Sequence, residues 1–121
     1  MKLDHLVLLS SDLTASAQHY DAILPRLGFQ KAREWVWANA DGISIDLRAS
    51  KAGFEYERYA PGLNHFAFSV GSREEFERIV SDLRYAGVAV PAVQEFGEAM
   101  AIFIPDPDGV RLEIAWEPEA G

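Results

Sequence analysis

Short apolar segments open both halves of the chain, and each is followed by the pattern of an amphipathic helix. The segments run from Leu3 to Leu9 and from Asn64 to Val70. Asp12 is a helix N-cap candidate after the first, and Ser72 with Glu75 three residues later forms a capping box after the second. Apolar residues then recur at steps of three and four, which is the spacing of a buried helix face. Each half is therefore predicted to begin with a strand and a helix.

Further strands are predicted after each helix. In the first half, Pro25 should bend or end the helix and Gly28 should close it. Strands are then predicted over Phe29 to Asn39 and Ile43 to Arg48, with a turn at Asp41-Gly42 between them. The second half predicts strands over Val88 to Val93, Met100 to Ile104 and Val110 to Trp116, with a turn at 105–109.

The two halves repeat each other at polar as well as apolar positions. Residues 4–12 (DHLVLLSSD) align with residues 64–72 (NHFAFSVGS), and residues 41–47 (DGISIDL) align with residues 108–114 (DGVRLEI). We therefore expect one domain over 1–121, with module one at 1–48, an ordered linker at 49–62 and module two at 63–117. The expected fold class is α+β. Two mixed sheets in a pseudo-two-fold arrangement would curve around a cleft, with the helices outside.

Strand alternation assigns four chemically active side chains to the cleft. His65 alternates with the aromatic residues that should meet the helix, so it should face the cleft, and His5 should do so by the same logic. Asp46 and Glu113 lie on the polar faces of the last strands of their modules. Two histidines and two carboxylates can therefore converge.

Composition narrows the class of partner. The formal net charge is −8, which argues against nucleic acid and against an anionic membrane surface as partners. Cysteine is absent, so disulfides, thiolate zinc sites and cysteine nucleophiles are excluded. The start of the chain resembles no secretory leader, and no apolar run is long enough to span a membrane. We expect a cytoplasmic protein that binds a small molecule.

Imidazole and carboxylate groups suit a divalent ion such as Zn, Ni, Mn, Fe or Co. Two histidines and one carboxylate on rigid strands leave coordination positions for water or substrate. We expect His5, His65 and Glu113 to be ligands, while Asp46 is either a fourth ligand or the ion-pair partner of Arg48. The alternative is that each histidine is structural and that Glu113 faces solvent or pairs with a neighbouring arginine.

The two halves resemble the βαβββ modules of the vicinal oxygen chelate superfamily, which includes glyoxalase I, extradiol dioxygenases, fosfomycin-resistance enzymes and bleomycin-resistance proteins. The resemblance runs from Asp4 to Trp116 and rests on residues 4–6, 27–29, 64–68 and 106–113. It implies that His5, His65 and Glu113 are the metal triad. Asp46 falls where glyoxalase I has a glutamate ligand, so it departs from that pattern. The resemblance also implies a homodimer.

The expected function is that of a metal-dependent, glyoxalase-like enzyme of the lyase or isomerase type. Its substrate would be a small molecule that chelates the ion through vicinal oxygens, and Glu113 or Asp46 would move a proton. Substrate contacts are expected from two indoles and two guanidinium groups: Trp35, Trp37, Arg48 and Arg111.

Two alternatives stay open at this point. One is an iron extradiol-type dioxygenase. The other is a non-catalytic binding or resistance protein in which aromatic side chains surround a cationic or hydrophobic compound. The cage would comprise Trp35, Trp37, Tyr56, Tyr59 and Phe96. Alternatively, Trp35 and Trp37 pack in the core or at a dimer interface.

Overall fold

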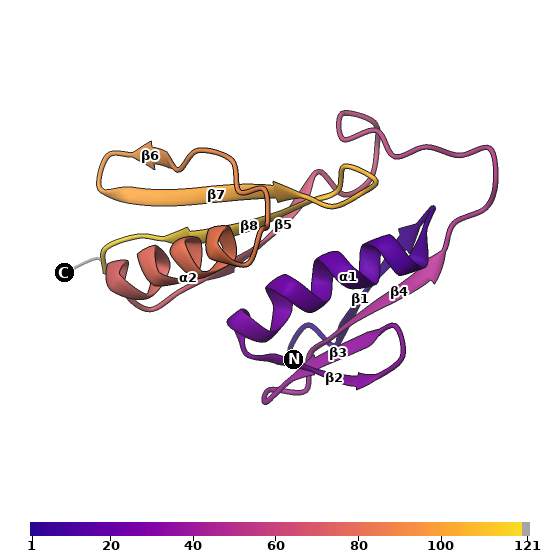
Figure 1. The fold of residues 1–121 in the computed structure, drawn as a ribbon, viewed down its shortest axis with the longest axis horizontal. Helices are drawn as coiled ribbons and strands as arrows, with labels where there is room; N and C mark the ends of the chain where they lie inside the picture. The colour runs from indigo at the N-terminus through magenta and orange to yellow at the C-terminus, as the bar shows by residue number, and fades with distance from the viewer. Residues whose placement is uncertain (120–121) are drawn as a thin grey trace. The chain divides into compact units, whose positions relative to one another are not determined.

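The computed structural model describes residues 1–119, and the chain divides into two compact units. Unit 1 comprises residues 1–56, and unit 2 begins at Glu57, so the division falls inside the predicted linker. Each unit has its own sheet and its own helix (Figure 1). That the two units act as a single domain stays a prediction. Among the described residues, no helix combines the length and apolar character needed to span a membrane.

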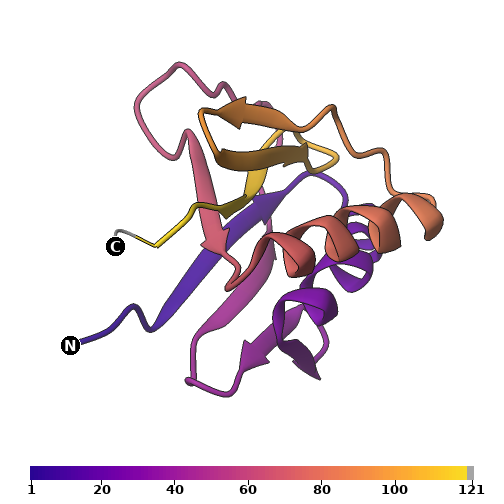
Figure 2. The ribbon, with the colours of Figure 1, turned by 90° about the vertical axis from the view of Figure 1, so that its left-hand side faces the viewer.

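Unit 1 is one strand, one helix and three further strands. The elements are β1 (His5–Ser10), α1 (Leu13–Ile23), the 3-10 helix η1 (Leu24–Leu27), β2 (Phe29–Arg33), β3 (Val36–Asn39) and β4 (Ser44–Ala49). The sheet order is β1-β4-β3-β2. β1 is parallel to β4, and the other pairs are antiparallel (Figure 2).

Unit 2 repeats this arrangement. Its elements are β5 (His65–Ser69), α2 (Arg73–Tyr85), β6 (Gln94–Phe96), β7 (Ala99–Pro105) and β8 (Arg111–Trp116). The sheet order is β5-β8-β7-β6, again with one parallel pair and two antiparallel pairs. Two repeated βαβββ modules with mixed four-stranded sheets confirm the predicted α+β class.

The helices begin and end where the sequence indicates. The Asp12 carboxylate caps α1 by accepting a hydrogen bond from the backbone N–H of Ala15 at 3.1 Å, and Ser72 caps α2 in the same way. The Glu75 carboxylate accepts from the N–H of Gly71 rather than from that of the N-cap residue. Gly28 closes η1 with a φ of 87°, a conformation that costs glycine little.

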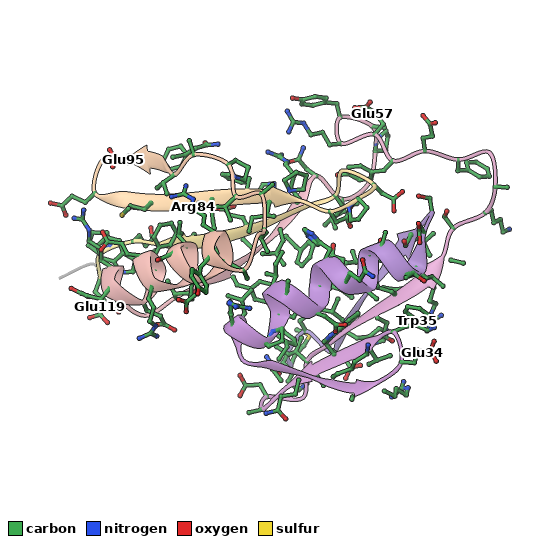
Figure 3. All side chains as sticks on the ribbon, in the orientation of Figure 1. Glu34, Trp35, Glu57, Arg84, Glu95 and Glu119 are labelled. Carbon is green, nitrogen blue, oxygen red and sulfur yellow. The ribbon has the colours of Figure 1, made fainter. Side chains whose placement is uncertain are left out.

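Two of the predicted strands are wrong. Residues 29–39 form a hairpin rather than one strand, because the chain turns at Glu34 and Trp35 and Trp35 adopts a φ of 67° (Figure 3). Residues 88–93 form no strand. Pro91 lies in this stretch and has no N–H to donate to a neighbouring strand. Pairing with β7 begins only at Gln94.

Each unit buries one face of its sheet beneath its own helix. Along β4 and β8, the residues that alternate with Asp46 and Glu113 are the buried ones. Both carboxylates therefore lie on the sheet face opposite the helix. The most deeply buried large side chains are Tyr20, Ile23, Leu24, Phe29, Trp37 and Ile45 in unit 1, and Phe76, Leu83, Ile102, Ile104, Leu112 and Ile114 in unit 2.

Candidate functional site

A histidine and a glutamate meet on the polar sheet face of unit 2. His65 begins β5 and pairs with Arg111 on the neighbouring parallel strand β8. Glu113 follows Arg111 at the next position of β8 that faces the same side of the sheet. The His65 Nε2 and Glu113 Oε1 atoms are 3.0 Å apart. The histidine side chain is 35% exposed and the glutamate side chain 17%, so the pair is partly shielded but open to a small molecule.

The hydrogen bonds of the Asn64 side-chain amide determine which nitrogen of the His65 ring carries a hydrogen. Asn64 Nδ2 donates to the carbonyl of Arg58 at 3.0 Å, so the atom facing the ring is the amide oxygen. That oxygen is 2.7 Å from His65 Nδ1, and it also accepts from Arg111 Nη2 at 2.9 Å. An amide oxygen can only accept, so Nδ1 must carry a hydrogen. In the neutral ring, the Nε2 lone pair then points at the Glu113 carboxylate.

Two acceptors at this separation need a proton or a cation between them. Zinc bonds to histidine nitrogen and carboxylate oxygen are each about 2.0–2.2 Å long, which places two ligands of one ion roughly 3 Å apart. The His65–Glu113 distance fits this spacing. Within residues 1–119, no group of three or more histidine, aspartate or glutamate side chains forms a complete metal cluster. The pair therefore fits two ligands of a divalent ion, which is part of a ligand set.

Unit 1 carries the equivalent pair of residues on adjacent strands. His5 begins the edge strand β1, and Asp46 lies on β4 with its side chain on the same sheet face, because His5 pairs with Ser44 in the parallel register. His5 Nδ1 lies 2.7 Å from Asp4 Oδ2, and Asp46 Oδ1 accepts from the Ser44 hydroxyl at 3.0 Å. The hydrogen bond from His5, reinforced by the charge of its ring, holds the pKa of Asp4 below its ordinary value.

The structure thus brings one predicted pair into contact in unit 2 and places the equivalent pair on one sheet face in unit 1. His65 and Glu113 are in direct contact, and His5 and Asp46 share one sheet face. A single site made from all four side chains stays a prediction. Arg48 follows on the Asp46 face of β4 and is exposed.

The assignment of Trp37 to substrate binding needs correction. The side chain is fully buried in the core of unit 1, near Tyr20, and its indole N–H donates to Asp21 Oδ1 at 2.8 Å. Trp37 pairs with Ile45, which lies on the buried face of β4. The sequence predicted that Trp35 and Trp37 lie on one face of a single strand. The chain turns at Trp35 instead, so the two indoles do not share a strand face. Trp35 is half-buried at the tip of the β2–β3 hairpin (Figure 3).

Arg111 lies beside the His65–Glu113 pair, because it is the partner of His65 in the sheet register. Its guanidinium carbon is 5.1 Å from the centre of the Phe103 ring, which also contacts the His65 ring edge-on at 5.3 Å. Its Nε is buried and has no hydrogen-bond partner among the described residues. A guanidinium group can donate charge-assisted hydrogen bonds to an anionic ligand.

Two residues that contact the His65–Glu113 pair, Asn64 and Phe103, were not predicted from the sequence as site residues. Asn64 aligns with Asp4 in the internal repeat, so the repeat carried a usable signal for it. Phe103 gave no signal beyond strand alternation, because its pairing with Glu113 depends on the sheet register. Of the predicted cage residues in unit 2, Tyr59 and Phe96 are exposed, and the guanidinium of Arg58 stacks on the Tyr59 ring.

Comparisons with known proteins agree with this architecture. Uncharacterized protein YqjT of Bacillus subtilis (strain 168) is 28% identical over 124 residues, covering 93% of this chain and 96% of that protein. A glyoxylase/bleomycin resistance protein/dioxygenase domain from Frankia sp. EAN1pec has a similar structure, with a TM-score of 0.80 and 24% identity, covering 100% of this chain and 95% of that one.

Two further solved structures share the fold. The fosfomycin resistance protein FosX of Listeria monocytogenes has a TM-score of 0.72 at 18% identity, covering 98% of this chain and 94% of its own. A lactoylglutathione lyase of Agrobacterium tumefaciens has a TM-score of 0.63 at 17% identity, covering 95% and 92%. A family model described as Glyoxalase/Bleomycin resistance protein/Dioxygenase superfamily matches residues 2–114. The chain therefore belongs to the Glyoxalase/Bleomycin resistance protein/Dioxygenase superfamily.

Proposed function

We propose that this chain is a metal-dependent enzyme of the glyoxalase type, acting on a small molecule with two neighbouring oxygens. The observation that carries the proposal is the contact of 3.0 Å between His65 Nε2 and Glu113 Oε1, which are two acceptors when the ring is neutral. His5 would supply the third ligand to the same ion, as the family resemblance implies, and Asp46 is the candidate for a fourth. Zinc, nickel, manganese, iron or cobalt would suit these donors. When bound, such an ion supplies Lewis acidity to a chelating substrate.

Protein side chains would orient the substrate and move the proton. Glu113 is a partly buried carboxylate that can accept a proton when its contact with the cation loosens, and Asp46 is the second candidate for this role. Arg111 would bind an anionic group of the substrate through its guanidinium group, which lies beside His65. Arg48 would contribute similarly from unit 1. A homodimer, which the resemblance also implies, is part of the proposal.

One structural neighbour supports an enzymatic function by its name, and another is consistent with a small-molecule ligand. One is a lactoylglutathione lyase and the other a fosfomycin resistance protein. Because aspartate stands at position 46 where glyoxalase I has glutamate, the proposal names the reaction type and leaves the substrate to a screen of vicinal-oxygen compounds.

The test is elemental analysis of the purified protein beside His65→Ala and Glu113→Gln variants. We expect about one divalent ion per chain in the unaltered protein and loss of the ion in both variants. His19→Gln alters the one histidine outside the predicted ligand set and should retain the ion. Parallel loss in His5→Ala would show that the two modules serve one ion.

Failure to bind any ion after reconstitution with nickel, zinc, manganese and iron would refute the proposal. Binding of cationic or aromatic ligands would then be tested instead, as the non-catalytic alternative predicts. Oxygen consumption by an iron-loaded protein would favour the dioxygenase alternative over the lyase or isomerase type.

A further inference from the structure

Both predicted histidine ligands are preceded by a side chain that accepts a hydrogen bond from the ring. His5 Nδ1 lies 2.7 Å from the Asp4 carboxylate, and His65 Nδ1 lies 2.7 Å from the Asn64 amide oxygen. The two contacts occur in separate compact units with separate sheets. The same contact therefore recurs at the same position of the repeat.

We propose that Asn64 is a positioning residue that holds His65 in the Nδ1–H tautomer and presents its Nε2 lone pair to Glu113. Asp4 has the same role for His5. A neutral imidazole can carry its hydrogen on either nitrogen, and a hydrogen bond to one nitrogen determines which is left to bind a cation. The inference deepens the proposed function, because it names the residues that prepare the histidines to act as ligands.

The amide at position 64 connects three parts of unit 2. Its oxygen accepts from both His65 and Arg111, and its nitrogen donates to the carbonyl of Arg58 in the loop before β5. A carboxylate could accept both hydrogen bonds but could not donate to that carbonyl. At the equivalent position in unit 1, the Asp4 side chain is 81% exposed, and its carboxylate accepts a hydrogen bond from His5. An asparagine at position 64 can therefore make all three contacts, whereas an aspartate could make only two.

Asn64 therefore couples the orientation of the His65 ring to that of the Arg111 guanidinium group. Both groups depend on one oxygen atom, and both lie on the face that carries Glu113. Removing this oxygen should release the ring and the guanidinium together. Loss of such outer hydrogen bonds lowers metal affinity about 10–100-fold in characterised sites.

The direct test is ¹⁵N NMR of the histidine rings in the metal-free protein, at about pH 8.5, where an ordinary imidazole is neutral. We expect the Nδ1–H tautomer at His65 in the unaltered protein and in Asn64→Asp, and mixed tautomers in Asn64→Leu. Asn64→Asp is the matched control, since both variants lose the contact with Arg58 but only Asn64→Leu loses the acceptor. Asp4→Leu should change His5 alone.

Metal titration of the same proteins gives the second measurement. Asn64→Leu should bind the ion about 10–100-fold more weakly, and Asn64→Asp should bind close to the unaltered protein. An Nε2–H tautomer at His65, or an unchanged tautomer in Asn64→Leu, would overturn the inference. If the unaltered protein binds no metal while the tautomers shift as expected, the proposed function fails and the positioning role stands. Asn64 is exposed, so both variants should fold.

Discussion

Replacing Glu113 by glutamine should stabilise the metal-free protein while it removes metal binding. The substitution preserves shape but turns one carboxylate oxygen into an N–H donor. In the unaltered protein with a neutral His65 ring, the carboxylate faces the Nε2 lone pair at 3.0 Å, because Nδ1–H donates to Asn64. The glutamine amide can donate to Nε2, so an unfavourable contact becomes a hydrogen bond.

The expected size of this effect follows from the contact that is gained. A neutral hydrogen bond contributes about 0.5–1.5 kcal/mol net, so the free energy of unfolding should rise by about 1 kcal/mol without metal. With an ion at about one hundred times its dissociation constant, the unaltered protein should gain about 2.7 kcal/mol and the Glu113→Gln variant nothing. The order of stability of the two proteins should therefore reverse when metal is added.

Urea unfolding at about pH 8.5, with chelator and then with added ion, measures both differences. Glu77→Gln is a suitable control, since Glu77 forms an exposed pair with Arg73 at 3.1 Å and its loss should cost about 0.3–0.5 kcal/mol. A clear loss of stability in metal-free Glu113→Gln would show that His65 carries two hydrogens and forms an ordinary ion pair. The contact between Nε2 and the Glu113 carboxylate would then be favourable without a metal ion, contrary to this prediction.

Three further predictions test the surroundings of the site. Trp37→Phe should lower the free energy of unfolding by about 2–3 kcal/mol, because a buried indole and its hydrogen bond to α1 are lost, while metal content stays the same. Asp106→Ala should cost about 2 kcal/mol in urea unfolding, because two backbone N–H groups of the β7–β8 turn lose their acceptor, whereas Asp106→Asn retains it. His5→Ala should raise the pKa of Asp4 in an NMR titration, and an unchanged pKa would contradict the contact between them.

Local sequence signals predicted most of the secondary structure correctly. Caps, helix periodicity and glycine turns depend on residues within a few positions of one another, and these located both helices and the exit at Gly28. The two errors had local causes that the hydrophobic pattern hides. A positive φ at Trp35 divides one predicted strand, and residues 88–93 form none although they are mainly apolar.

The candidate site was likewise predicted correctly in part and wrongly in part. Strand alternation correctly placed His65 and Glu113 on one face, because alternation is a local property of an extended chain. It failed for Trp37, because the turn before β3 changes which residues face the helix.

The two repeated modules and the polar strand faces could be predicted from the sequence, because both follow from short-range periodicity and from the internal alignment. What the chemistry of those faces can be depends on contacts that form only when the chain folds. The role of Asn64 requires Arg58, His65 and Arg111 to meet at one amide, and Arg111 is 47 residues away along the chain. Hydrogen-bond direction depends on atoms that folding brings within about 3 Å, and no pattern along the sequence encodes that separation.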